Sequence, residues 1–172
     1  GEIIINNVHI EKMTENKLVA FRRQNVGFIF QSYNLLPTMN ALDNVALPLM
    51  FRGVGKKKRQ EVAKRYLTLV GLKGQIFQNG NAMSGGQQQR VGIARALAMQ
   101  PKIIFADEPT GNLDTKTTGE VLNLMKEIVA TEKQTLIMVT HDTNIAAVAD
   151  RQIRIVDGKI NDGEEIHYED IQ

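Results

Sequence analysis

A glycine-rich stretch near the middle of the chain has the residue types of a phosphate-binding site. Ser84, Gly85, Gly86 and Gln87 open the run "SGGQQQR", and Ser84 with Gln87 matches the capping box that begins many helices. Backbone N–H groups at a helix N-terminus carry partial positive charge, so a serine and two glycines there predict an anion site. The run contains no lysine, and no phosphate loop of the G-x-x-x-x-G-K-[ST] type occurs in the 172 residues.

Two adjacent carboxylates form a second candidate site. The apolar run Ile103–Ala106 leads directly into Asp107 and Glu108, which Pro109 follows. Neighbouring residues of an extended segment point in different directions. One carboxylate can therefore hold Mg²⁺ through its waters while the other faces an attacking water. Uncompensated carboxylates at the end of a buried strand are costly, so this context favours a functional pair over a solvated loop.

Polar side chains also follow two other apolar runs. Gln31 follows Val26–Phe30, and His141 lies just after Thr135–Val139. In isolation, Gln31 is interpreted as a turn residue and His141 as a packed or capping histidine. In open parallel sheets, however, ligands bind outside the carboxyl ends of the strands. Each of the three apolar runs is followed by a polar side chain of a kind that binds metal, water or phosphate, which favours one shared pocket. In that pocket we expect His141 to contact a terminal phosphate and Gln31 to contact the metal or the attacking water.

The alternation of short apolar runs with helical patterns predicts an α/β fold. The runs Ile103–Ala106 and Thr135–Val139 are apolar on both faces, which is typical of the buried centre of a parallel sheet. The segment between them has helical spacing and predicts the crossover of a βαβ unit, with a buried stripe of Val121, Leu122, Met125, Ile128 and Val129.

Other patterns predict two further helices and two turns. A helix over Ala41–Leu72 is expected to bury Val62, Tyr66, Leu69 and Val70. A second helix begins at Ser84, stops before Pro101, and is expected to bury Val91, Ala94 and Ala98. The turn signals are Asn6-Asn7 and Asp157-Gly158, and the latter predicts a hairpin after Ile153 and Ile155.

Composition excludes several classes of protein. The length of 172 residues fits one domain, and the net charge of +2 does not mark a nucleic-acid binder. No apolar run approaches the roughly 20 residues that cross a bilayer. Cysteine is absent, which excludes disulfides and suits a reducing cytoplasm. The basic run Lys56–Arg59 is interpreted as one solvated face of a helix.

The motifs together resemble the ATP-binding subunit of ABC transporters, over nearly the whole chain and in the family's order. Gln31 stands at the Q-loop position, "MSGGQQQR" at the signature, "IIFADEPT" at Walker B, "GNLD" at the D-loop and "THD" at the switch histidine. The stretches "QSYNLLPTMNALDNVALPL" and "DEPTGNLD" look most similar to the macrolide-export, lipoprotein-release and peptide-antibiotic exporters of the family.

This resemblance implies that two subunits meet head to tail, each signature closing over ATP held by the other. Ser84, Gly85, Gly86 and Gln87 would then bind a γ-phosphate that arrives with the phosphate-loop lysine of the second subunit. Asp114 would bridge to that subunit. A homodimer of such subunits is expected.

The resemblance also implies roles at the strand ends. Asp107 would hold Mg²⁺ through water, and Glu108 would act as general base. His141 would contact the γ-phosphate, and Gln31 would sense the metal and link to the membrane partner. The implied cofactors are ATP and Mg²⁺.

The implied fold is the α/β core of a P-loop NTPase with an inserted helical subdomain. We expect a single partial nucleotide-binding domain over 1–172, in which about 32–78 form the subdomain that docks a permease. The family's phosphate loop would precede Gly1, so about 40 residues of an ordinary domain are expected to be missing. The chain alone should therefore hydrolyse little ATP, and the subunit should lie peripherally at the cytoplasmic face of the cell membrane.

Three functions remain open at this point. The first is an ATPase that energises a membrane exporter. The second is an ABC-type ATPase of translation or DNA repair, which would act on nucleic acid. The third is a non-catalytic regulator of a cell-division or cell-wall partner that resembles a permease. The single domain and the intact stretch "NLLPTMNALDNVALPL" favour the exporter, without a nucleic-acid partner.

Overall fold

The computed structural model describes residues 1–161 in two compact units. The first unit is Gly1–Val139, and the second begins at Thr140. The expected domain of 1–172 therefore includes eleven residues, 162–172, that lie outside the described part. Within 1–161, no helix is both long enough and apolar enough to span a bilayer.

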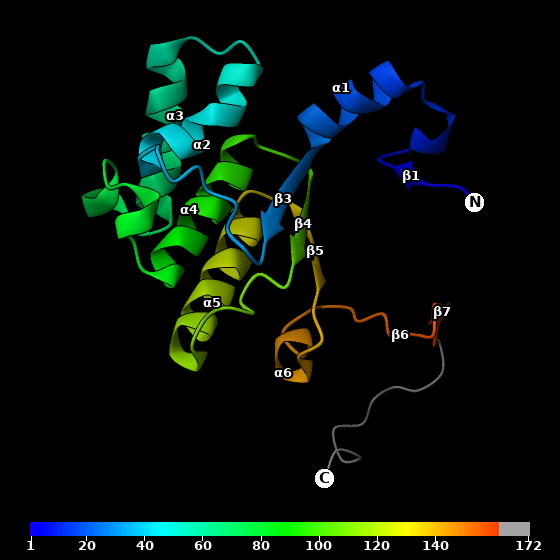
Figure 1. The fold of residues 1–172 in the computed structure, drawn as a ribbon. Helices are drawn as coiled ribbons and strands as arrows, with labels where there is room; N and C mark the ends of the chain where they lie inside the picture. Colours follow the sequence, from blue (N-terminus) through cyan, green and yellow to red (C-terminus); the bar gives the residue numbers. More distant parts are fainter. Residues whose placement is uncertain (162–172) are drawn as a thin grey trace. The chain divides into compact units, whose positions relative to one another are not determined.

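A parallel sheet forms the centre of the first unit (Figure 1). Its strands are β3 (Val26–Phe30), β4 (Ile103–Asp107) and β5 (Thr135–Val139), in that spatial order. Phe30 pairs with Asp107, and Asp107 pairs with Val139. All three strands therefore end at the same edge of the sheet. This is the arrangement that the sequence pattern predicts, because it brings the polar residues after the strands toward one pocket.

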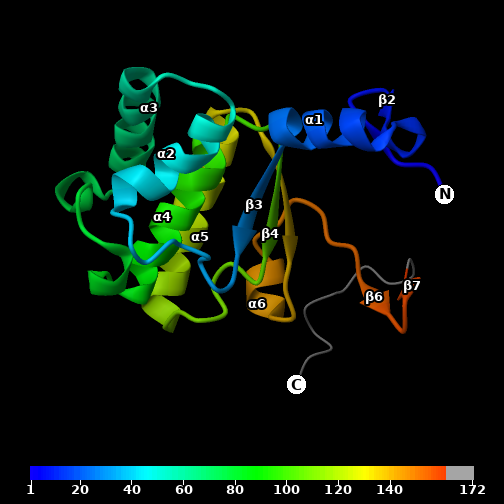
Figure 2. The ribbon, with the colours of Figure 1, turned by 45° about the horizontal axis from the view of Figure 1, so that its top comes forward.

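Two helices cover one face of this sheet (Figure 2). They are α4 (Gly85–Ala98) and α5 (Thr115–Thr131), and α5 is the predicted crossover between β4 and β5. The predicted inward residues of α4, which are Val91, Ala94 and Ala98, are all buried. In α5 the buried residues are Val121, Met125 and Ile128. These side chains pack with Ile29, Ile104 and Ala106 of the strands into one core.

The opposite face of the sheet is exposed and aromatic. The ring of Phe28 stacks on those of Phe30 and Phe105, with centroids 5.9 and 5.7 Å apart, and Phe28 is 48% exposed. Ile137 and Val139 of β5 are also exposed. The prediction that Thr135–Val139 lies in a buried centre is therefore wrong for this chain. Its strand is at the edge of the sheet, and the helices of the first unit cover only the other face.

The chain enters β3 from α1 (Glu15–Asn25). Before α1 lie a hairpin of β1 (Ile4–Ile5) and β2 (Val8–His9) and the short helix η1 (Ile10–Lys12). Asn6 and Asn7 both have positive φ, which confirms the predicted turn.

The predicted helix over 41–72 is two helices. They are α2 (Ala41–Phe51) and α3 (Lys56–Leu69), and the short helices η2 (Lys73–Gln75) and η3 (Gly80–Ala82) follow. Gly53 has a φ of +77° in the break, a conformation that favours glycine and ends the first helix. In α3, Leu69 is exposed instead of buried, and Leu67 takes its place in the core because α3 packs on both α2 and α4.

The second unit contains α6 (Thr143–Ala146) and a hairpin of β6 (Ile155–Val156) and β7 (Lys159–Ile160). Its turn residues Asp157 and Gly158 have positive φ, as the predicted hairpin requires.

A buried asparagine fixes the segment that leads into α2. The amide oxygen of Asn44 accepts from the Leu36 N–H at 2.8 Å, and its amide nitrogen donates to the carbonyls of Leu36, Met39 and Asn40. The Asn44 side chain is fully buried, so these backbone groups form hydrogen bonds to it in place of hydrogen bonds to water.

We expect Asn44→Ala to lower the free energy of unfolding by about 2–4 kcal/mol, because it removes the buried side chain that bonds the Leu36 N–H and the carbonyls of Leu36 and Met39. Urea unfolding followed by circular dichroism measures this change. Asn123→Ala is the control, since Asn123 is exposed on α5 and its replacement should change stability little. Equal effects of the two substitutions would contradict the assigned role of Asn44.

Candidate functional site

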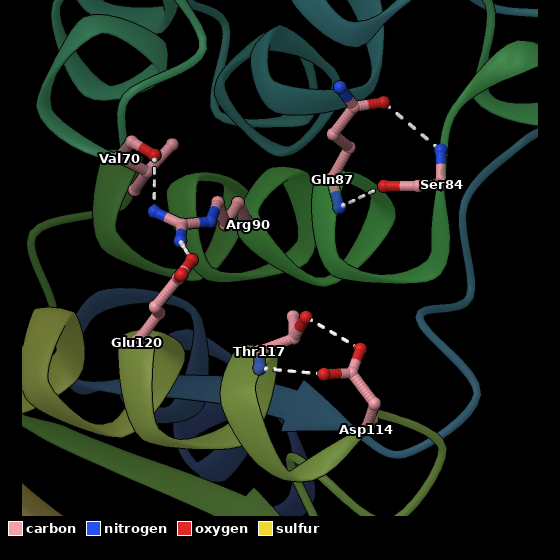
Figure 3. Close-up of polar contacts among 7 residues, drawn as sticks. All are labelled: Val70, Ser84, Gln87, Arg90, Asp114, Thr117 and Glu120. Atoms are coloured by element: carbon pink, nitrogen blue, oxygen red, sulfur yellow. Dashed lines mark hydrogen bonds and ion pairs between the residues drawn. The ribbon is translucent and has the colours of Figure 1, made fainter.

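The N-terminus of α4 has the capping box that the sequence predicts. The hydroxyl oxygen of Ser84 accepts from the Gln87 N–H at 3.3 Å, and the Gln87 side-chain oxygen accepts from the Ser84 N–H at 3.0 Å (Figure 3). Gly85 and Gly86 follow in the first turn, where no carbonyl of the same helix can accept from their N–H groups. The Ser84 hydroxyl and these two N–H groups can therefore donate together to an anion.

The two glycines are required by close approach of neighbouring elements. A Cβ atom on Gly86 would lie 2.6 Å from the Thr117 methyl carbon in α5. A Cβ atom on Gly85 would lie 2.8 Å from the hydroxyl oxygen of Tyr33, which follows β3. Real Cβ atoms do not approach other atoms this closely, so the start of α4 fits between Tyr33 and α5 only without side chains.

Asp114 caps the N-terminus of α5. One carboxylate oxygen accepts from the Thr117 N–H at 3.0 Å, and the other accepts from the Thr117 hydroxyl at 2.7 Å (Figure 3). These two hydrogen bonds lower the pKa of the Asp114 carboxyl group, with the backbone bond the larger cause. Thr117 contacts both Asp114 and Gly86, and we did not predict it from sequence. The local pattern "DTKT" is a capping signal that points to it.

The carboxyl edge of the sheet holds the other predicted residues of the first unit. Asp107 is exposed at the last position of β4, and Glu108 is half-buried with a φ of +43°. The Glu108 N–H donates to the Val139 carbonyl at 3.0 Å, which continues the ladder between β4 and β5. Positive φ at a residue other than glycine is strained and is common at functional sites.

Gln31 lies against the loop that follows Glu108. Its amide nitrogen would be 2.6 Å from a Cβ atom on Gly111, and its backbone carbonyl accepts from the Asn112 side chain at 3.0 Å. The Gly111 N–H in turn donates to the Glu108 carbonyl at 3.0 Å. The structure therefore brings Gln31 together with the loop of the two carboxylates, as the sequence predicts for these strand ends.

An arginine of α4 holds the backbone after Gln31. Tyr33 and Asn34 both have positive φ, and both of their carbonyls accept from the guanidinium of Arg95. Burial lowers the pKa of Arg95 and raises that of the Tyr33 hydroxyl. Sequence reasoning missed Arg95 and Asn112, because their partners are 62 and 81 residues away.

His141 belongs to the second unit. It lies between Thr140 and Asp142, whose N–H donates to the Thr140 hydroxyl oxygen at 3.1 Å. Asp142 then caps α6 by accepting from the N–H groups of Asn144 and Ile145. The role of His141 toward a phosphate stays a prediction.

The residues at the sheet edge suit a magnesium ion that takes only one or two of its ligands from the protein. No group of three histidine, cysteine or acidic side chains within residues 1–161 could form a metal cage. Mg²⁺ normally keeps several waters and binds one or two carboxylates together with substrate phosphates. The exposed carboxylate of Asp107 fits that donor set, and Gln31, which follows the neighbouring strand, carries an amide oxygen of the same kind.

Comparison with known proteins agrees with this arrangement. The sequence profile described as "ABC transporter" matches residues 1–111, which is more than half of the chain. This protein belongs to the ABC transporter family.

Relatives place the chain among the ATP-binding proteins of this family. The macrolide export ATP-binding/permease protein MacB of Rhodopirellula baltica is 44% identical over 93% of the chain, which spans 24% of MacB. The lipoprotein-releasing system ATP-binding protein LolD of Hyphomonas neptunium is 41% identical over 94% of the chain, which spans 71% of LolD. The predicted resemblance to the macrolide-export and lipoprotein-release group is confirmed.

A solved structure of the family has the same fold. The ATP-binding cassette MJ0796 of Methanocaldococcus jannaschii, described as a dimer in a post-hydrolysis state bound to ADP and Pi, matches with a TM-score of 0.80. It is 40% identical and covers 93% of this chain, which spans 71% of the solved chain. The predicted fold class, an ABC ATPase core with a parallel sheet, is confirmed.

The contact between Gly86 and Thr117 can be tested through stability. Gly86→Ala places a methyl group against the Thr117 methyl, and such overpacking should cost about 1–3 kcal/mol of unfolding free energy. Thr117→Ser in the same chain should restore most of that loss, because it removes the methyl and keeps the capping hydroxyl. Gly119→Ala is the matched control: no atom lies within 4 Å of its Cβ position, so alanine should stabilise α5. A Gly86→Ala chain as stable as the original would contradict the contact.

The cap at Asp114 should make stability depend on pH. Its carboxyl pKa is lowered in the folded protein, so the stabilisation is present above the ordinary value of 3.8 and is lost as pH falls through the folded pKa. We expect Asp114→Ala to lower the thermal midpoint at pH 7. The gap in thermal midpoint between this variant and the original chain should narrow only below pH 3.8, the ordinary pKa. Asp114→Asn should keep much of the cap without this pH dependence. Thermal unfolding of the three chains, monitored by circular dichroism between pH 7 and 3, measures this pH dependence. A difference that stays constant with pH would show that the carboxylate is not the cap.

Proposed function

We propose that the chain is part of an ATP-hydrolysing subunit that energises a membrane exporter, and that ATP binds between two copies of this subunit. The start of α4 carries this proposal. It presents a hydroxyl and two N–H groups suited to a phosphate at a helix N-terminus. In a dimer of complete subunits, the phosphate bound there is the γ-phosphate of ATP that the other subunit holds.

In the proposed dimer, Ser84, Gly85 and Gly86 contact the γ-phosphate of ATP held by the other subunit. Gln87 acts through the capping box, because its side-chain oxygen holds the Ser84 backbone and so orients the serine. Asp114 stands at the start of the neighbouring helix α5, where its remaining acceptor capacity faces the partner. The dimeric description of the related cassette MJ0796 supports this arrangement.

At the sheet edge, the proposed chemistry is attack of a water on the γ-phosphorus. Glu108 accepts a proton from the water, the bond between the γ-phosphorus and the bridging oxygen breaks, and ADP leaves. Gln31 orients the water or the metal, and His141 contacts the γ-phosphate. Asp107 would hold Mg²⁺ through water, and the bound ion would supply positive charge to neutralise the phosphates.

The proposed partner is a permease. MacB is an ATP-binding/permease protein by name, and this chain spans only 24% of it. A groove among α2, β3 and α4 offers a largely apolar surface for that partner, and its lining includes Phe28, Leu47 and Phe51 together with Arg95. Met50 and Phe51 are exposed beside it. Such a contact would hold the subunit peripherally at the cytoplasmic face of the membrane. The similarity to two exporter proteins favours this function over a nucleic-acid ATPase.

Substitution of the proposed base tests this function in the complete subunit. Glu108→Gln keeps the side-chain shape but cannot accept the proton, so hydrolysis should fall by about 10²-fold or more. ATP binding should persist, and the variant should elute as a dimer from size-exclusion chromatography when ATP and Mg²⁺ are present.

Glu127→Gln is the control, because it makes the same chemical change at an exposed position of α5. This control should hydrolyse ATP at the original rate and should not accumulate as a dimer. A Glu108→Gln subunit with the original turnover would show that Glu108 is not the base.

A further inference from the structure

The helices α4 and α5 begin side by side, and the contact between their first turns has no interlocking side chains. The contact is between Gly86 and the Thr117 methyl group. Glycine has no side chain that could interlock with its neighbour, so this contact does not itself fix how the first turn of α4 lies along α5, although core packing holds the rest of the helix. Yet Ser84 and Asp114, which begin the two helices, must reach one nucleotide together under the proposed function.

An ion pair lies one helical turn beyond this contact. The Arg90 guanidinium and the Glu120 carboxylate are joined by an Nη2–Oε2 distance of 3.0 Å (Figure 3). Arg90 is four residues after Gly86, and Glu120 is three residues after Thr117. Residues at these spacings lie on the same face of a helix, so the pair stands directly behind the glycine contact.

The same guanidinium also reaches a third helix. Its other terminal nitrogen, Nη1, donates to the carbonyl of Val70 at 3.3 Å, and Val70 is the C-cap residue of α3 (Figure 3). Gly71 follows with a φ of +80°, and its Cβ position would be 3.7 Å from Nη1. One planar side chain therefore joins the end of α3, the body of α4 and the first turns of α5.

The exposure of this pair indicates that it affects the relative position of the two helices more than the folding stability. The Arg90 and Glu120 side chains are 21% and 51% exposed, and ion pairs exposed to this degree contribute little to folding stability. A second pair, Arg65–Glu132, joins α3 to the C-terminal end of α5 at 2.9 Å, with exposures of 60% and 22%. It is a matched interaction on the same helix, but it lies at the end remote from Ser84 and Asp114.

We propose that Arg90 and Glu120 are positioning residues that fix the first turns of α4 against those of α5, within the placement that core packing gives the two helices. They fix where Ser84, Gly85 and Gly86 stand relative to Asp114, so that both helix starts meet the nucleotide of the partner subunit together. The inference rests on the proposed function, because it assigns the pair an effect on ATP closure between subunits. Misplacement of reacting groups by about 1 Å can cost up to 10²-fold in rate, so a weak pair can have a large effect there.

The test compares Glu120→Ala and Glu132→Ala in the complete subunit. We expect Glu120→Ala to lower kcat for ATP by about tenfold while KM changes less than about twofold, because each subunit still binds its own ATP. Glu120→Gln should recover much of the loss, since its amide oxygen can still accept from Arg90. Both alanine variants should shift the thermal midpoint by a similar small amount, and Glu132→Ala should keep the original kcat.

Three results would overturn the inference. The first is a Glu120→Ala subunit with the same kcat as the unmodified subunit. The second is a Glu132→Ala subunit that loses as much kcat as Glu120→Ala. The third is a loss of kcat in Glu120→Ala that is accompanied, and explained, by a much lower thermal midpoint. The proposed function fails separately. If the unmodified subunit neither hydrolyses ATP nor dimerises with it, the proposed function is overturned and this inference falls with it. If the unmodified subunit is active and Glu120→Ala is equally active, only the inference is wrong.

Discussion

The packing of α4 against its neighbours on several sides is the constraint on which the first unit depends. Its buried residues face the sheet, the pair α2 and α3, and α5, so little of the helix can move without opening the core. Because the helix is held along its length, the direction of its N-terminus is set by core packing. The glycines at that end then let Tyr33 and Thr117 approach the backbone. An anion site results from the way the helix is packed.

The same helix stabilises strained backbone at the sheet edge. Tyr33 and Asn34 adopt positive φ, which costs free energy for residues with side chains, and the two hydrogen bonds from Arg95 compensate for that cost. On the next strand, Glu108 is also at positive φ, and its N–H is bonded to Val139. The loops after β3 and β4 are thus tied to rigid elements. Their positions depend on α4 and on the ladder between β4 and β5.

Local patterns in the sequence were enough to predict much of this fold. The strand Val26–Phe30 has the predicted bounds, and the capping box of Ser84 and Gln87 has both of its hydrogen bonds, because each depends on residues close in the chain. The break between α2 and α3 was missed, since Gly53 and Gly55 lie within a pattern that continues as a helix. The exposed face of β5 could not be predicted, because an apolar strand has the same sequence pattern whether or not a layer covers it.

Of the candidate site, the motif residues could be predicted but their supports could not. Gln31 and Glu108 were identified from the ends of apolar runs and from family resemblance. Arg95 and Asn112 hold the backbone next to Gln31, but a spacing of 62 or 81 residues carries no signal in a single sequence. The Arg90–Glu120 pair was missed for the same reason, since its members are 30 residues apart on different helices. Local chemistry therefore pointed to the site, and tertiary packing determined what supports it.

The stacked rings of Phe28, Phe30 and Phe105 have a practical consequence for handling this chain. Parallel sheets in proteins are normally covered on both faces, and here one face presents aromatic and branched side chains to water. Within residues 1–161, no strand pairs with the outer edge of β5, which lies beside that surface. A solution of the 172-residue chain by itself should therefore be colloidally unstable, and its precipitation would reflect an uncovered layer of a well-packed fold and not a failure to fold.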